Sequence, residues 1–251
     1  MITLNPKQLQ QYREEGYCLV RNLIPPAVIA PVRQRTLAMI ENPPAWVEES
    51  WQVIDPQRYQ TKADQPLPAG IQLPAKEEAA FQTMADHPNL AAAMSQLLGG
   101  DVQRFTDQVG IKHGCNQEEQ GGRSFYHQDS YYWHLSPELG CNCWIPMDST
   151  GQNAIALAVI PGSQKTWKLV EHEAYFDDPA EGHLRGGKFT SFKRFRIPLQ
   201  NVDFSKEVLV PMEPGDGLFF TNYTWHRSEP NRTGQTKSFY AIAYQLPPQT
   251  K

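Results

Sequence analysis

The sequence contains few cysteines and no long run of apolar residues. Its four cysteines are Cys18, Cys115, Cys141 and Cys143. Cys141 and Cys143 stand too close together for a zinc knuckle, and no second pair accompanies them. We therefore expect reduced thiols in a cytoplasmic protein. Because no apolar stretch reaches 18 residues, no transmembrane helix is expected.

The charge balance and the first residues exclude further classes. The net charge of −4 gives no general sign of nucleic-acid binding. The first residues lack a basic segment followed by an apolar core, so no secretory signal is expected. Apolar residues make up 40% of the 251 positions and charged residues 20%, which is typical of a folded globular protein.

We expect one domain over residues 1–251, with mainly helical support in 1–100 and a β core in 101–251. Apolar periodicity and capping residues predict helices over 7–15, 26–39 and 77–98. Short apolar runs between turn residues predict strands over 17–20, 102–111, 143–147, 154–160, 208–211, 217–221 and 238–245. Residues 41–78 and 171–196 fit neither pattern, and long irregular segments are often functional, so each is a candidate lid.

His127, Asp129 and the distant His226 are the candidate metal ligands. Side chains at i and i+2 of a strand point to the same side, so His127 and Asp129 could reach one metal ion, with His226 arriving from a partner strand. Two imidazoles and one carboxylate form the facial triad that holds ferrous iron and leaves positions open. With seven histidines in the chain, the bare pattern also fits a surface His and an Asp in a turn.

Several further sequence motifs argue against a surface His and an Asp in a turn. They are Leu4–Gln8 with Glu15–Val20, Leu97–Val102, Tyr126–Asp129 with Tyr132 and Trp133, Asn153–Ala154 with Val159–Gln164, Pro214–Asp216 with Phe219–Phe220, and His226–Asn231. In this order they resemble the phytanoyl-CoA dioxygenase-like family of iron and 2-oxoglutarate oxygenases over nearly the whole chain. Gln164 stands where the family usually has His.

The resemblance implies a mostly β fold with flanking helices. That fold is a double-stranded β-helix, a cupin-like jelly roll with the N-terminal helices packed outside. The resemblance also implies Fe(II) bound by His127, Asp129 and His226, and 2-oxoglutarate chelating the iron.

The far carboxylate of 2-oxoglutarate needs a cation, and here the chain departs from its relatives. Lys237 stands where the family has Arg, and Ser228 matches a family Ser that contacts the same carboxylate. Arg grips a carboxylate as a planar fork, whereas Lys offers one movable charge. We expect Lys237 to serve, with Arg232 as a substitute that is more simply a solvated turn residue.

Three further residues are candidates for cofactor binding by resemblance. Lys112 and Gln108 would share one face of the strand before the metal ligands. An outward polar face is the alternative for both. Trp144 matches an aromatic position near the cofactor, although core packing explains it equally well.

The family implies a dioxygenase that hydroxylates an unactivated C–H bond of a small metabolite, consumes O2 and converts 2-oxoglutarate to succinate and CO2. Related halogenases replace the carboxylate ligand with a small residue, and Asp129 fills that place here, which favours hydroxylation. Desaturation and cyclisation remain open. The other classes are a non-catalytic cupin-type binding protein and a 2-oxoglutarate-independent iron enzyme on the same barrel.

The substrate is less well specified. Three aromatic residues, Tyr131, Tyr132 and Trp133, follow the metal ligands and could line the site of an apolar or cationic ligand, or pack in the core. A basic, Phe-rich run could clamp an anionic group, or could be a solvated flap; its charges are Arg185, Lys188, Lys193, Arg194 and Arg196. We expect a small-molecule substrate and neither a nucleic acid nor a membrane as partner.

Overall fold

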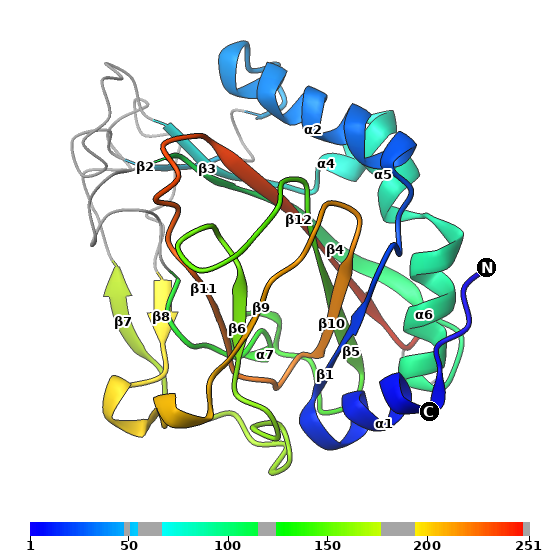
Figure 1. Ribbon diagram of the computed structural model, residues 1–251, viewed down its shortest axis with the longest axis vertical. Coiled ribbons are helices and arrows are strands. Elements are labelled where there is room, and N and C mark those ends of the chain that lie inside the picture. Colours follow the sequence, from blue (N-terminus) through cyan, green and yellow to red (C-terminus); the bar gives the residue numbers. More distant parts are fainter. Residues whose placement is uncertain (48–50, 55–66, 115–123, 177–193, 248–251) are drawn as a thin grey trace.

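The computed structural model describes residues 1–47, 51–54, 67–114, 124–176 and 194–247 (Figure 1). A large antiparallel sheet has the order β1-β10-β5-β12-β4-β3-β2, and a smaller sheet has the order β11-β6-β9. The large sheet consists of β1 (Tyr17–Val20), β2 (Trp51–Ile54), β3 (Leu67–Gln72), β4 (Gln103–Lys112), β5 (Gly140–Pro146), β10 (Gly217–Thr221) and β12 (Lys237–Gln245). The small sheet consists of β6 (Leu157–Val159), β9 (Val208–Val210) and β11 (His226–Ser228), and a separate hairpin pairs β7 (Glu173–Phe176) with β8 (Arg194–Arg196).

Helices line one outer side of the large sheet (Figure 1). They are α1 (Pro6–Glu15), α2 (Pro26–Glu41), α4 (Pro74–Glu77), α5 (Ala79–Ala85) and α6 (Pro88–Leu98), while α7 (Ser130–Trp133) and the 3-10 turns η2 (Leu199–Asn201) and η3 (Phe204–Lys206) lie elsewhere. The capping box of Asn5 and Gln8 starts α1, and Gly16 ends it at a φ of 83°. Within the described residues, no helix has the length and apolarity needed to cross a membrane.

The two faces of the large sheet bury different clusters. On β12, Tyr240 and Ile242 pack with the helices, whereas Phe239 and Ala241 face the small sheet. This alternation follows from the two-residue period of a strand. The inner face, between the two sheets, also carries Trp144 of β5. The mostly β, jelly-roll prediction with helices outside is therefore confirmed.

The helix predicted over 77–98 is broken into shorter pieces. Pro88 begins α6, and the residue before a proline is pushed out of the helical region. His87 accordingly adopts an extended conformation and accepts a hydrogen bond from the Asn89 N–H at its ring nitrogen. The helices predicted near 7–15 and 26–39 are confirmed as α1 and α2.

The strand predicted over 154–160 is shorter than expected. Asn153 and Ile155 have φ values of 61° and 59°, which interrupt an extended chain, so β6 begins at Leu157. The other predicted strands are present within a few residues. The candidate lids contain regular structure: β2 pairs with β3 inside 41–78, where β3 also joins β4 of the large sheet, and β7 pairs with β8 inside 171–196. Residues 48–50, 55–66 and 177–193 of these segments lie outside the described residues.

Candidate active site

His127 and His226 face each other across a backbone bridge. The His127 N–H donates to the His226 carbonyl at 3.1 Å, and the His226 N–H donates to the His127 carbonyl at 3.2 Å. Directly opposed residues of an antiparallel pair project to the same side. Their ring centroids are accordingly 4.3 Å apart.

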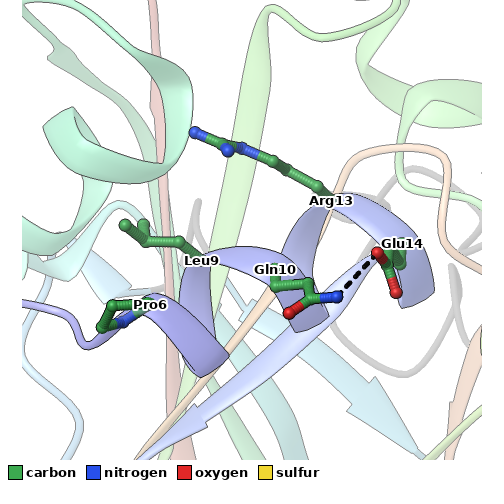
Figure 2. Close-up of a pocket in the computed structure, with 5 residues that line it drawn as sticks. All are labelled: Pro6, Leu9, Gln10, Arg13 and Glu14. Carbon is green, nitrogen blue, oxygen red and sulfur yellow. Dashed lines mark hydrogen bonds between the residues drawn. The ribbon is translucent and has the colours of Figure 1, made fainter.

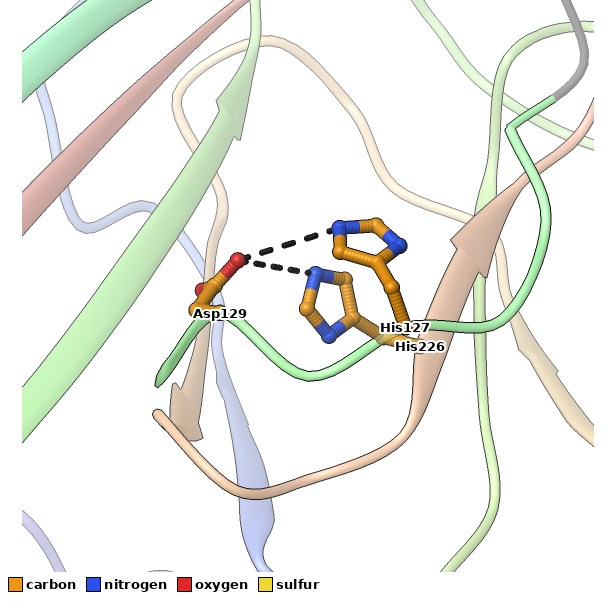
Figure 3. Close-up of side chains that lie close together, drawn as sticks. All are labelled: His127, Asp129 and His226. Carbon is orange, nitrogen blue, oxygen red and sulfur yellow. Dashed lines mark ion pairs between the residues drawn. The ribbon is translucent and has the colours of Figure 1, made fainter. Parts of the chain in front are cut away.

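Asp129 reaches the two imidazoles from the start of a helix. Its Oδ1 lies 3.8 Å from His127 Nε2 and 3.5 Å from His226 Nε2 (Figure 3). The backbone of Asp129 is helical, with φ −60° and ψ −36°, at the N-cap of α7. The strand alternation expected for His127 and Asp129 is therefore wrong, although the predicted convergence occurs. Their ligand atoms and that of His226 lie within 4.8 Å of one another.

The backbone orients both rings. His127 Nδ1 lies 2.9 Å from the Phe125 carbonyl, and His226 Nδ1 lies 2.9 Å from the Thr224 carbonyl. A carbonyl can only accept, so each Nδ1 carries the proton and each Nε2 offers a lone pair. Backbone carbonyls that accept a hydrogen bond from the other ring nitrogen commonly orient metal-binding histidines in this way. Both lone pairs point toward the Asp129 carboxylate.

The charges at the triad suit a cation. Burial and the neighbouring His226 ring lower the pKa of His127 to about 3. Burial alone would raise the pKa of Asp129, but the two imidazoles and a hydrogen bond from Asn142 lower it overall. Burial alone would lower the pKa of His226, but the adjacent carboxylate raises it. Neutral His127 and ionised Asp129 are the forms in which these groups bind metals.

Asn142 of β5 fixes the second oxygen of Asp129. Its amide Nδ2 donates to Asp129 Oδ2 at 3.0 Å, which leaves Oδ1 toward the histidines. Asn142 is buried, and its own Oδ1 has no hydrogen-bond partner among the described residues. Sequence reasoning missed Asn142. The available signal was its position two residues before Trp144, on the same face of a strand.

Arg227 holds the strand that carries His226. Its guanidinium donates to both Glu207 oxygens, at 2.7 and 2.6 Å, and to Glu229 at 2.6 Å. A bidentate pair of this kind is strong and directional. Arg227 stands between His226 and Ser228, and its side chain is largely buried. This anchor was also missed from the sequence.

Gln128 ties down the loop between the two proximal ligands. Its Nε2 donates to the carbonyls of Lys168 and Tyr223, each at 3.0 Å. Its Oε1 accepts from the Val170 N–H at 2.9 Å, and its backbone N–H donates to His172 Nε2 at 3.2 Å. These bonds satisfy a buried amide and fix the path of the loop.

A buried lysine lies beside Ser228. The Lys112 ammonium donates to Ser228 Oγ at 2.5 Å and to the Glu229 carbonyl at 2.8 Å. The Ser124 hydroxyl lies 2.8 Å from the same Ser228 Oγ. Ser228 and His226 are two residues apart on β11 and share its face, so Lys112 lies on the same side of β11 as the triad.

Lys237 takes another direction. It pairs with Lys112 across β12 and β4, so both begin on the same face of the sheet. The Lys237 ammonium donates to the Ser149 carbonyl at 2.7 Å in an exposed position. The structure thus brings Lys112, rather than Lys237, to Ser228. Arg232 lies half-buried on the loop after β11, and its N–H donates to the Asn153 carbonyl.

Trp144 and Gln108 lie on the inner face of the large sheet. Trp144 is buried and stacks on Phe239, with ring centroids 4.7 Å apart. Gln108 is half-buried and accepts a hydrogen bond from Gln72 at 2.8 Å. Both residues therefore lie on the face of the sheet that is turned toward the triad.

The structure does not bring the candidate substrate residues together in one group. Tyr131 stacks on His172 at 4.1 Å, whereas Trp133 packs its edge against Phe105 of β4 at 5.7 Å. Arg194 belongs to β8, but its side chain and residues 185–193 lie outside the described part. Arg196 pairs with Glu173 at 2.7 Å.

A hollow of about 420 Å³ lies along α1 (Figure 2). It is lined by Pro6, Leu9, Gln10, Arg13 and Glu14. These side chains all belong to one helix, and the close-up shows the Gln10–Glu14 hydrogen bond. The hollow adds no group to the metal-binding residues.

The donor set fits ferrous iron. Two neutral imidazole nitrogens and one carboxylate oxygen on one side are the ligands of a facial triad, which leaves positions for other molecules. Thiolates would favour zinc or a cluster, but Cys18, Cys141 and Cys143 are free, buried and absent from this group. Cys115 lies outside the described residues.

Solved structures share this fold. EctD from S. alaskensis matches with a TM-score of 0.69 and 16% identity, over 97% of this chain and 77% of its own. The epimerase SnoN, in complex with Fe3+, alpha ketoglutarate and nogalamycin RO, matches with a TM-score of 0.64 and 17% identity, over 95% and 82%.

Sequence comparisons identify relatives and the family. A probable phytanoyl-CoA dioxygenase of Caenorhabditis elegans is 25% identical over 92% of this chain and 72% of its own. A methylphosphonate hydroxylase of Gimesia maris is 25% identical over 96% and 81%. The sequence model of phytanoyl-CoA dioxygenase (PhyH) matches residues 12–239. The chain therefore belongs to the phytanoyl-CoA dioxygenase (PhyH) family.

Proposed function

We propose that this protein hydroxylates an unactivated C–H bond of a small metabolite, with Fe(II) held by His127, Asp129 and His226. The observation that carries the proposal is the convergence of three ligand atoms within 4.8 Å, with both histidine tautomers set by backbone carbonyls. Iron and 2-oxoglutarate together supply the activation of O2 that C–H cleavage requires. We treat the whole chain as one catalytic domain, which the family match over residues 12–239 supports.

The protein's own part is to bind and orient. Asn142 keeps the Asp129 carboxylate turned so that one oxygen faces the metal position, and the Phe125 and Thr224 carbonyls keep the imidazole lone pairs aimed there. Such preorganisation spares the site a rearrangement when its ligands bind.

Lys112 and Ser228 are our candidates for the far carboxylate of 2-oxoglutarate. Ser228 lies two residues along β11 from His226, which corresponds to about 7 Å of strand. A five-carbon diacid can bridge such a span. A buried ammonium beside a hydroxyl offers a charge-assisted site for a carboxylate. Lys237 is a secondary cation in this proposal, because its ammonium is engaged at Ser149. Gln108 and Trp144 would line the inner face nearby.

Hydroxylation is favoured over other outcomes by Asp129 and by relatives. Asp129 fills the third protein position, so no halide site is left in its place. A relative is named as a hydroxylase. The same fold also occurs in a protein named as an epimerase, so the outcome must be measured on the product.

A small anionic metabolite is the proposed substrate class. The relative named methylphosphonate hydroxylase acts, by its name, on a small anion. The basic residues between 185 and 196 would suit such a group.

Three free thiols among the described residues support a reducing, cytoplasmic setting.

The first experiment is an anaerobic titration of the Fe(II)-loaded protein with 2-oxoglutarate. We expect a weak visible charge-transfer band that saturates, because a 2-oxo acid would chelate iron on the open face of the triad. Iron binding without any band would contradict the co-substrate assignment and favour the non-catalytic or 2-oxoglutarate-independent classes.

The second experiment decides the reaction. Small anionic metabolites are screened for stimulation of succinate release, and each product is analysed by mass spectrometry. We expect a gain of one oxygen atom. Loss of two hydrogens would indicate desaturation or cyclisation, and an unchanged mass would indicate epimerisation; either result would contradict hydroxylation.

A further inference from the structure

The open side of the triad lies at His127. The His127 side chain is 20% exposed, whereas those of Asp129 and His226 are 9% and 6% exposed. A molecule that enters from solvent therefore meets the His127 side first. The residues that flank the His127 ring therefore line the route from solvent to the triad.

Tyr132 flanks that ring. It lies on α7, three residues after Asp129, and its ring stands edge-on to the His127 ring with centroids 5.9 Å apart. Its residue is 41% exposed, which is high for a large aromatic side chain beside a buried site. The Tyr132 ring thus offers apolar surface on the path to the triad.

The Tyr132 hydroxyl holds a second segment. It accepts from the Phe195 N–H at 2.9 Å and donates to the Phe195 carbonyl at 3.1 Å. One phenol can make both bonds, because it is a donor and an acceptor at once. We call this pair of bonds the Tyr132–Phe195 latch. It joins α7 to β8, two segments that lie 63 residues apart in the sequence.

The latch sets the position of the Phe195 ring. That ring lies 6.3 Å from the Tyr132 ring and 5.2 Å from the Tyr131 ring, between centroids. Tyr131 in turn stacks on His172, which accepts from the Gln128 backbone between the two ligands. The three aromatic rings and the His172 imidazole therefore form a continuous wall from β8 to Gln128, the residue between the two proximal ligands.

We infer that the Tyr132–Phe195 latch fixes the entrance to the iron and selects substrates there, with Tyr132 as a positioning and specificity-determining residue. A substrate with an apolar portion would pack that portion on the exposed Tyr132 ring while its reacting C–H bond approaches the metal. The inference rests on the proposed function only in that it assumes iron at the triad.

The test compares Tyr132→Phe with Tyr131→Phe. Tyr132→Phe keeps the ring and removes the latch. Tyr131→Phe removes a hydroxyl that makes no hydrogen bond among the described residues. Amide hydrogen exchange at Phe195, measured on the metal-free protein, should become about tenfold faster in Tyr132→Phe only, since two neutral hydrogen bonds are lost. Unchanged exchange in Tyr132→Phe would overturn the latch.

A second readout concerns the entrance. Loss of Fe(II) to a bulky chelator should be about tenfold faster in Tyr132→Phe than in the wild type and Tyr131→Phe, while binding of the small probe nitric oxide should be unchanged. Equal chelator rates in all three proteins would overturn the role at the entrance. If no variant binds iron, the proposed function fails, yet the exchange measurement still decides the latch.

Discussion

At the metal end of the site, formed by His127, Asp129 and His226, each side chain has a fixed hydrogen-bond partner close in sequence or on a buried strand. At the lysine end, formed by Lys112, Ser228 and Lys237, two long side chains leave one sheet face and reach different acceptors. Both ends lie on the inner face of the barrel. Short side chains fixed by backbone carbonyls have one geometry, whereas a lysine has four rotatable carbon–carbon bonds.

The two ends should therefore respond differently to substitution. Removing a ligand at the metal end leaves no nearby replacement for it, because among the described residues the group that could hold a metal ion contains only these three side chains. At the lysine end, one ammonium can move into the place of another.

The largest effect is expected for His226→Ala. The variant should lose specific Fe(II) binding while its far-UV circular dichroism stays native-like, since two remaining ligands hold a divalent ion poorly. His127→Ala should behave alike. His134→Ala is the control, because His134 is exposed and lies outside the triad. Wild-type iron affinity in either triad variant would refute the ligand assignment.

Lys112→Met should raise the Kd for 2-oxoglutarate by about 10–100-fold, because hydrogen bonds to a charged group are worth roughly 1.5–3 kcal/mol. Iron binding should stay intact. Lys237→Met, at the directly paired position, should raise the Kd only by a small factor. Anaerobic titration of the visible band measures both. The reverse order of effects would return the anchor to Lys237, as expected from the sequence.

Asn142→Leu should weaken Fe(II) binding by about 10–100-fold, the usual effect of removing a group that orients a metal ligand. Leucine has a similar volume but cannot donate to Asp129 Oδ2. Competition with a chromophoric chelator gives the affinity. If Lys112→Met weakened iron binding as much as Asn142→Leu, the separation between the two ends would be disproved.

Gly110→Ala should destabilise the sheet between the two ends. The Phe239 ring occupies the place where a Cβ at Gly110 would lie, and that ring stacks on Trp144. Overpacking of this kind costs about 1–3 kcal/mol in the free energy of unfolding. Thermal denaturation measures it against Gly151→Ala, whose Cβ would meet nothing within 4 Å. Equal melting temperatures would contradict the close packing.

Lys237→Arg should have the smallest effect. The Lys237 ammonium is already engaged at the exposed Ser149 carbonyl, and Arg can make the same bond. The Kd for 2-oxoglutarate should stay within a few-fold of the wild-type value. A marked tightening would show that a planar fork at this position reaches the co-substrate.

The sequence predicted the convergence of His127, Asp129 and His226 because their residue types and order are restrictive. It did so partly for a wrong reason, since Asp129 lies in a helical turn and not on a strand. Asn142 was missed because its role depends on which strands are neighbours: β5 lies between β10 and β12, and no local pattern gives that order. The choice between Lys112 and Lys237 likewise depends on rotamers, since both lie on one face.

Local signals also failed where tertiary pairing decides. Residues 67–72 contain Pro68 and Gly70, which weaken a strand prediction, yet Gly70 pairs with Gly110 as β3 joins β4. The break before α6 does have a local signal, because Pro88 pushes His87 out of the helical region. Arg227 resembles any surface arginine until β11 is placed beside Glu207.

The position of β12 has a consequence for how the protein is made. It is the last of the described strands to leave the ribosome, yet it is inserted between β5 and β4, in the middle of the large sheet. Until residues 237–245 are available, β4 and β5 each expose an unpaired edge, which invites wrong pairing with other chains. A nascent or prematurely terminated chain should therefore depend on chaperones far more than the finished protein, although it already contains all three metal ligands.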